Sequence, residues 1–346
     1  MNTELLKRVN NMANLAGLRE FTLTCGKGAG MRAFEVHNAA GLRFTVLADK
    51  CMDILEVSYK GTNISFNSKN GLVSETRSPL LGEEFLYYFN GGMLTTCGPN
   101  NAGGGCDDNG TWRAFHGRFG CQSAENVTAK AFWDGDDYIM ELTGDIRDSR
   151  LFGYNFLLSR TIRTSLYSKS ISISDTLVNC QPEAEEYMML YHINFGYPLL
   201  DAGARVVSSD TEVIPRTPFA AEDMRWNEID SPEDGLEERC YFHKCTADER
   251  GFARVGLLND ELKLGAFVKY NLDSLPLLVE WKSMCSHDYA LGLEPSNSYI
   301  KGRVEERENG TLRTLGGYEK AEFKLTIGIL EGEELRGFET ELGALK

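Results

Sequence analysis

The 346-residue sequence has little positive charge, few histidines and no long apolar run. Its 36 lysines and arginines are outnumbered by 51 aspartates and glutamates, giving a net charge of -15 at pH 7. Such a charge argues against nucleic acid and anionic membrane surfaces as partners. No stretch approaches the ~18–20 apolar residues of a membrane span, and the first residues lack the apolar segment of a signal peptide. We therefore expect a cytoplasmic protein.

Cysteine and glycine motifs are also missing. The nine cysteines include no C-x-x-C pair and no metal-type spacing, which favours a reduced chain over a disulfide framework. Neither a P-loop nor a Rossmann fingerprint is present, because Gly103–Gly105 is not followed by the Lys-Ser/Thr of a phosphate cradle. The sequence gives no reason to expect a cofactor.

Short β-rich runs make up most of the chain, separated by Gly, Asn and Lys about every ten residues, which predicts antiparallel sheets. Residues 3–15 carry apolar side chains at helical spacing and predict a short helix before the first strand. Two long segments rich in Gly, Asn or Pro, 91–110 and 213–236, are expected to be functional loops. No linker separates the strands, so we expect a helical lead-in over 1–18 and one β domain over 19–346.

Glu294 is the first candidate for chemistry, because it places a carboxylate in an apolar segment, 289–293, just before Pro295. The alternation of that segment predicts a strand, and proline cannot donate to a sheet ladder, so Glu294 should lie at a strand end facing a cavity. Desolvation there would tune it as a general base. The alternative is a structural carboxylate that accepts hydrogen bonds from nearby backbone N–H groups.

Two of the five histidines stand in unusual settings. His116 follows the glycine-rich segment, beside the flexible Gly117. His192 and Asn194 alternate along a predicted strand and should share one of its faces. A core histidine with satisfied hydrogen bonds is the alternative interpretation of His192.

The order of these motifs carries a resemblance to a known family. The motifs are His116-Gly117, Tyr191-His192-x-Asn194-Phe195-Gly196 and Gly292-Leu293-Glu294-Pro295. They resemble the galactose mutarotase-like, or aldose 1-epimerase, superfamily, and most of all its bacterial branch of aldose 1-epimerase family proteins. The segments Val46–Ile54, Gly91–Gly98 and Glu280–Met284 resemble that branch too.

The resemblance implies an all-β fold, a large antiparallel β-supersandwich that binds a sugar on its concave face. It also implies an isomerase that interconverts sugar anomers by general acid–base catalysis. Glu294 would be the general base and His192 the general acid, while His116 would hold the sugar near its ring oxygen. Further substrate-binding candidates beside these motifs are Asp53, Arg118, Asn194, His243, Trp281, Lys282 and Asn297.

Anomer exchange needs a base for the O1 hydroxyl and an acid for the ring oxygen, and a carboxylate and a histidine can supply both near neutral pH. We expect His116, His192 and Glu294 to lie within a sugar's width of each other. Turnover should rise with pH as the glutamate ionises and fall as the histidine loses its proton.

Other functions remain open at this point. The same pocket could carry out another isomerase, epimerase or lyase reaction, or the protein could bind carbohydrate without turnover. A metal site built from His116, His192, His243 and Glu294 is a further alternative. The expected partner is a small-molecule sugar, and a homo-oligomer is left open.

Overall fold

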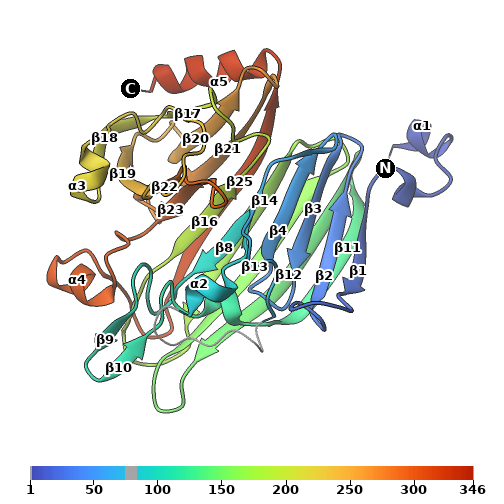
Figure 1. The fold of residues 1–346 in the computed structure, drawn as a ribbon. Helices are drawn as coiled ribbons and strands as arrows, with labels where there is room; N and C mark the ends of the chain where they lie inside the picture. Colours follow the sequence, from blue (N-terminus) through green and yellow to red (C-terminus); the bar gives the residue numbers. More distant parts are fainter. Residues whose placement is uncertain (1, 75–83, 346) are drawn as a thin grey trace.

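The computed structural model describes residues 2–74 and 84–345, and antiparallel sheets dominate it, as the alternation predicted (Figure 1). The largest sheet has eight strands in the order β11-β12-β13-β14-β25-β21-β20-β17. Its strands are β11 (Ala124–Asp134), β12 (Asp137–Ser149), β13 (Asn155–Ser165), β14 (Ser170–Asn179), β25 (Lys320–Glu331), β21 (Leu264–Asn271), β20 (Phe252–Asn259) and β17 (Arg205–Ser208).

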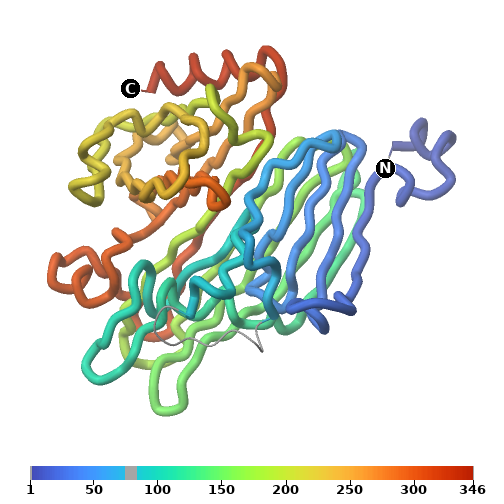
Figure 2. Tube along the Cα trace, in the orientation of Figure 1, coloured from blue at the N-terminus to red at the C-terminus, as the bar shows by residue number. Residues whose placement is uncertain are grey.

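Two smaller sheets pack against this one. A six-stranded sheet contains, in order, β18 (Asp210–Pro215), β19 (Arg239–Cys245), β22 (Leu277–Ser283), β23 (Ala290–Ser296), β16 (Leu190–Phe195) and β8 (Leu94–Cys97). A five-stranded sheet contains β1 (Gly17–Thr22), β2 (Arg32–His37), β3 (Leu42–Leu47), β4 (Asp53–Tyr59) and β5 (Thr62–Asn63). The two lie side by side in Figure 1, and the termini lie on opposite sides of the molecule (Figure 2).

Short elements complete the described chain. Three two-stranded sheets pair β6 (Phe66–Asn67) with β7 (Gly91–Gly92), β9 (Cys106–Asp108) with β10 (Thr111–Arg113), and β15 (Glu185–Tyr187) with β24 (Arg313–Leu315). The helices are α1 (Thr3–Leu6), α2 (Phe85–Tyr88), α3 (Pro218–Ala221), α4 (Arg303–Glu308) and α5 (Glu334–Gly343), with 3-10 turns at Met12–Asn14 and Phe119–Cys121. None of the helices described is long and apolar enough to cross a membrane.

One hydrophobic core joins the three large sheets, and strands of these sheets turn apolar side chains into the space between them. β13 shows the pattern clearly, since every second residue from Phe156 to Thr164 is buried. The core contains Phe44 of the five-stranded sheet, Ile162 of the eight-stranded sheet and Leu293 of the six-stranded sheet. This packing fixes the position of the strands that carry the candidate site.

A buried ionic network also links the three sheets. Arg160 donates to Asp175 and, through Nη1, to Oδ1 of Asp53 at 3.1 Å. Asp53 accepts further hydrogen bonds from the backbone N–H and hydroxyl of Thr96, and Tyr191 donates to Asp175 at 2.8 Å. The side chain of Arg160 is fully buried, so its charge depends on these two carboxylates.

Several expectations about local structure were wrong. The predicted helix over 3–15 is only Thr3–Leu6, because Asn11 caps the separate turn at Met12–Asn14 through a hydrogen bond to the N–H of Ala13. The predicted loops 91–110 and 213–236 contain strands β7, β8 and β9, the end of β18, and helix α3. The C-terminal helix α5 was not anticipated.

Candidate functional site

A cavity lies on one face of the six-stranded sheet. It spans about 560 Å³, a figure that includes space open to solvent. Strands β16, β19, β22 and β23 form its floor, and the segments around α2, His116 and Arg216 form its walls. Its chemically active lining residues are His116, His192, Arg216, Glu238, Cys240, Trp281 and Glu294.

His192 and Glu294 face each other across neighbouring strands. β16 and β23 are antiparallel, with Leu190 opposite Ser296 and Asn194 opposite Gly292, and the same register places His192 opposite Glu294. The Nδ1 atom of His192 lies 3.2 Å from Oε1 of Glu294. Neither atom meets hydrogen-bond geometry with a described partner, so this is a close contact rather than an aligned bond.

Gly292 provides the space for the Glu294 carboxyl group. A Cβ atom at position 292 would lie 2.3 Å from Oε1 of Glu294, closer than such atoms approach in proteins. It would also lie 3.2 Å from the Cβ of Trp281. The glycine two residues before the glutamate is therefore part of the site.

A tight loop after β10 brings His116 over the sheet. Gly117, at φ 77°, follows it, and a side chain there would lie 2.4 Å from the carbonyl oxygen of Gly98. The backbone N–H of Gly103 donates to Nδ1 of His116 at 3.3 Å, so the ring proton belongs on Nε2, which is free to donate to a ligand. The rings of His116 and His192 have their centroids 5.6 Å apart.

Burial sets the protonation of these groups. It raises the pKa of Glu294 well above its usual range, with Glu238 adding to the rise and Arg216 opposing it. It lowers the pKa of His192 to about 4, against a smaller raising effect of Asn194. It also lowers the pKa of His116, as do the neighbouring His192 and Arg216. Both imidazoles are therefore neutral around neutral pH, and when the His192–Glu294 pair holds one proton, that proton resides on the carboxyl group.

Aromatic rings surround the two histidines. Trp281 stands edge-on to His192 with ring centroids 5.5 Å apart, and its Nε1 donates to Glu238 at 2.6 Å. Phe89 lies 5.2 Å from His192 and Phe85 lies 5.1 Å from His116, measured between ring centroids. Trp281, Phe85 and Phe89 thus give the cavity an apolar wall that suits the carbon face of a sugar ring.

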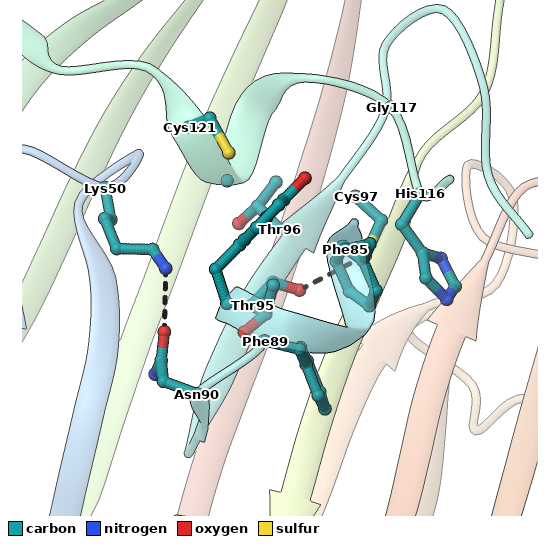
Figure 3. Close-up of a pocket in the computed structure, with 12 residues that line it drawn as sticks. Lys50, Phe85, Phe89, Asn90, Thr95, Thr96, Cys97, His116, Gly117 and Cys121 are labelled. Atoms are coloured by element: carbon teal, nitrogen blue, oxygen red, sulfur yellow. Dashed lines mark hydrogen bonds between the residues drawn. The ribbon is translucent and has the colours of Figure 1, made fainter. Parts of the chain in front are cut away.

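A smaller hollow of about 330 Å³ adjoins the cavity and shares Phe85, Phe89 and His116 with it (Figure 3). In it Lys50 donates to Oδ1 of Asn90 at 2.8 Å, as the dashed line in Figure 3 marks. His116 therefore lines both hollows.

The structure brings together His116, His192, Trp281 and Glu294, as the sequence predicted, while their roles stay predictions. Asn194 lies beside His192 but donates to the carbonyl oxygens of Gly92 and His192. Arg216 and Glu238 were missed. Glu238 lies one residue before a strand, where no motif marked it.

Like Asn194, five other predicted substrate-binding residues do not line the cavity. Asp53 belongs to the Arg160 network, and Arg118 pairs with Asp148 at 3.1 Å. Asn297 accepts from the N–H of Met189 at 2.7 Å and lines a different hollow. The other two residues are His243 and Lys282.

His243 and Lys282 lie on the face of the six-stranded sheet opposite to the cavity. Trp281 points into the cavity, so the alternation of β22 sends its neighbours Glu280 and Lys282 to the opposite face. Lys282 donates there to the carbonyl oxygens of Arg225 and Glu228. His243 lies 3.1 Å from Glu280, and the side chains of His243 and Glu280 are both fully buried.

The alternative metal site made of His116, His192, His243 and Glu294 is therefore wrong, because His243 lies on the other face of the sheet. Within 2–74 and 84–345, no group of three or more His, Cys, Asp or Glu residues is placed to hold a metal.

Comparison with solved structures identifies the class of fold. A candidate aldose 1-epimerase from Klebsiella pneumoniae superposes with a TM-score of 0.92 at 24% identity, over 100% of this chain and 91% of the other. A galactose mutarotase-like protein from Clostridium acetobutylicum gives 0.62 at 15% identity, over 92% and 99%. A galactose 1-epimerase from Lactobacillus acidophilus gives 0.60 at 14% identity, also over 92% and 99%. The fold is the galactose mutarotase-like sandwich, which confirms the fold prediction.

The sequence places the chain in a particular family within that class. The chain belongs to the family described as "Domain of unknown function (DUF4432)", whose model matches residues 28–329. Comparison with curated proteins gives no match.

Proposed function

We propose that this protein is an aldose 1-epimerase-type isomerase that interconverts the anomers of a sugar by general acid–base catalysis. The observation that carries the proposal is the His192–Glu294 pair, 3.2 Å apart and lining one cavity. The fold and the names of the similar structures support it.

The pair holds one transferable proton. Because burial penalises both charged forms, ionised Glu294 is a stronger base, and protonated His192 a stronger acid, than either group in water. The reactive arrangement has the proton on His192 and the charge on Glu294, and it contains the same number of protons as the resting pair. Arg216 favours it by lowering the pKa of Glu294.

The pair transfers its protons once when the sugar ring opens and again, in reverse, when the ring closes. Glu294 takes the proton of the O1 hydroxyl, the bond between C1 and the ring oxygen breaks, and His192 protonates the ring oxygen. Rotation about the C1–C2 bond turns the other face of the aldehyde to the ring hydroxyl. Ring closure then returns both protons. Nε2–H of His116 is available to hold an oxygen of the sugar, and Trp281 to pack on its carbon face.

Reducing conditions suit the chain, because no disulfide joins its nine cysteines and none of them is needed by this mechanism. A cytoplasmic location is therefore part of the proposal.

The test is exchange spectroscopy by NMR on a panel of neutral, deoxy and acidic sugars. We expect one class of sugar to exchange anomers faster than in buffer. Glu294→Gln should slow that exchange by ~10²–10⁴, the usual contribution of general acid–base catalysis, while sugar binding persists.

Glu280→Gln is a matched control. Glu280 is also a buried glutamate facing a histidine in the same sheet, but on the face away from the cavity, so its variant should keep exchange. If no sugar exchanges faster than in buffer, the proposal fails. Saturable binding without exchange would instead identify a carbohydrate-binding protein.

A further inference from the structure

Another hollow, separate from the candidate site, is lined by arginines. It encloses about 660 Å³ and shares no lining residue with the His192–Glu294 cavity. Arg113 and Arg118 enter it from the two ends of the loop that carries His116, and Arg150 enters from the β12–β13 connection. The remaining lining residues are Asn100, Thr111, Trp112, Ala114, Ser149 and Tyr154. None of the described residues that line the hollow carries a carboxylate.

The guanidinium groups are only partly neutralised. Arg113 lies 3.3 Å from Asp108, and Arg118 lies 3.1 Å from Asp148, and both carboxylates are buried behind the lining. Asp108 is also paired with two other arginines. The described residues place no carboxylate within 4.0 Å of Arg150, whose side chain donates only to the hydroxyl of Thr111, at 3.2 Å. In a chain of net charge -15, this hollow is a local centre of positive charge.

Other polar atoms of the lining can also form hydrogen bonds with a ligand. Nε of Arg113 is buried without a hydrogen-bond partner among the described residues. The amide of Asn100 donates to the hydroxyl of Tyr154 at 2.8 Å, and that hydroxyl donates to Asp148 at 3.1 Å, which holds the carboxylate back from the hollow. The guanidiniums and hydroxyls of the lining are donors typical of phosphate sites, while Oδ1 of Asn100 is an acceptor without a partner among the described residues.

We propose that this hollow binds the phosphate group of a small molecule through Arg113, Arg118 and Arg150. The phosphate oxygens accept from the three guanidiniums and from the hydroxyls of Thr111 and Ser149. The site does not depend on the sugar chemistry proposed above. Trp112, whose side chain is partly exposed, lies at its rim and can report on occupancy by fluorescence.

The experiment is a titration of the full chain with inorganic phosphate and, separately, with a sugar phosphate, by calorimetry and by Trp112 fluorescence. Potassium chloride at matched ionic strength corrects for screening. We expect one saturable site, and Arg150→Gln should weaken it about tenfold or more, because it removes a charged donor. Exposed Arg150 makes one side-chain hydrogen bond, so the variant should keep its fold, which circular dichroism checks.

Arg147→Gln is the matched control, because Arg147 lies three residues before Arg150, near the end of β12, donates to Asn155 at 2.7 Å and does not line the hollow. It should bind phosphate within about twofold of the wild type, since its charge is further from the site and screened. An equal loss in both variants would overturn the proposal in favour of a diffuse charge effect. Absence of saturable binding up to about 10 mM would overturn it outright. Equal affinity for both ligands identifies the phosphate group alone as the determinant, and tighter binding of the ester adds a contact from its organic part; both results support the site.

Discussion

Replacing Gly292 by alanine should disable the candidate site while leaving the fold in place. The new Cβ would lie 2.3 Å from Oε1 and 3.2 Å from Cδ of Glu294, so the carboxyl group must retreat. Reaching an ordinary contact requires a displacement of about 1 Å, and a misplacement of that size near the reacting atoms costs on the order of 10²-fold in rate. The backbone of Gly292 does not require glycine, since its φ is not positive. The stability cost should be that of modest overpacking, ~1–3 kcal/mol.

The assay is NMR exchange of the sugar identified in the panel, with thermal unfolding measured on the same samples. Gly337→Ala is the control, because nothing lies within 4 Å of a Cβ at that position of helix α5. It should keep full activity and gain ~0.5–1 kcal/mol of stability from the higher helix propensity of alanine. A folded Gly292→Ala protein with wild-type exchange would show that the position of the Glu294 carboxyl group does not matter, and Glu294 would then be a structural carboxylate.

Three further predictions concern the pH profile, the buried network and the aromatic wall. Exchange should be fastest at pH values between the pKa of His192, which burial lowers to about 4, and the raised pKa of Glu294. Below the pKa of His192 the pair gains a second proton, and above the pKa of Glu294 it loses its last proton. An acid limb centred near neutral pH would contradict this order. Asp53→Asn should lower stability by ~3–5 kcal/mol through the loss of a buried partner of Arg160, measured by denaturant unfolding, with the exchange rate of the folded protein unchanged. Trp281→Ala should weaken sugar binding roughly 3- to 10-fold by calorimetry, whereas Trp281→Phe keeps an aromatic face and should lose less.

The structure reverses the sequence-based assignment of the two pH limbs. With ordinary pKa values, the glutamate would ionise on the acid side and the histidine would lose its proton on the alkaline side. Burial moves the two pKa values past each other, so the acid limb belongs to His192 and the alkaline limb to Glu294. Sequence alone could not show this, because the shift depends on how deeply the folded sheet buries the pair.

Local patterns were enough to predict the β class and to single out His192 and Glu294 as separate candidates. Alternation placed His192 and Asn194 on one face, and the apolar run broken by Glu294 and Pro295 indicated a carboxylate at a cavity. What joined these distant segments was the antiparallel pairing of β16 with β23, which sets His192 opposite Glu294. That register depends on long-range packing, so here only the order of the motifs, through the family resemblance, pointed to it.

The same dependence explains the residues that were placed wrongly. Lys282 is adjacent to Trp281 in sequence, yet the period of two sends it to the opposite face. Arg118 is two residues from His116, but the turn after His116 directs it to Asp148. Proximity in sequence is therefore a poor guide within a strand or a tight turn, where neighbouring side chains point apart.

Two histidine–glutamate pairs in one sheet show what distinguishes a catalytic candidate from a structural contact. His243 and Glu280 are 3.1 Å apart, and His192 and Glu294 are 3.2 Å apart. Burial is the main cause that raises the pKa of both glutamates, so residue type, distance and burial do not separate the pairs. What separates them is that the His192–Glu294 pair lines the cavity of the candidate site. A difference in exchange rate between the Glu294→Gln and Glu280→Gln variants would therefore measure the effect of access to a substrate, with the chemistry of the pair held constant.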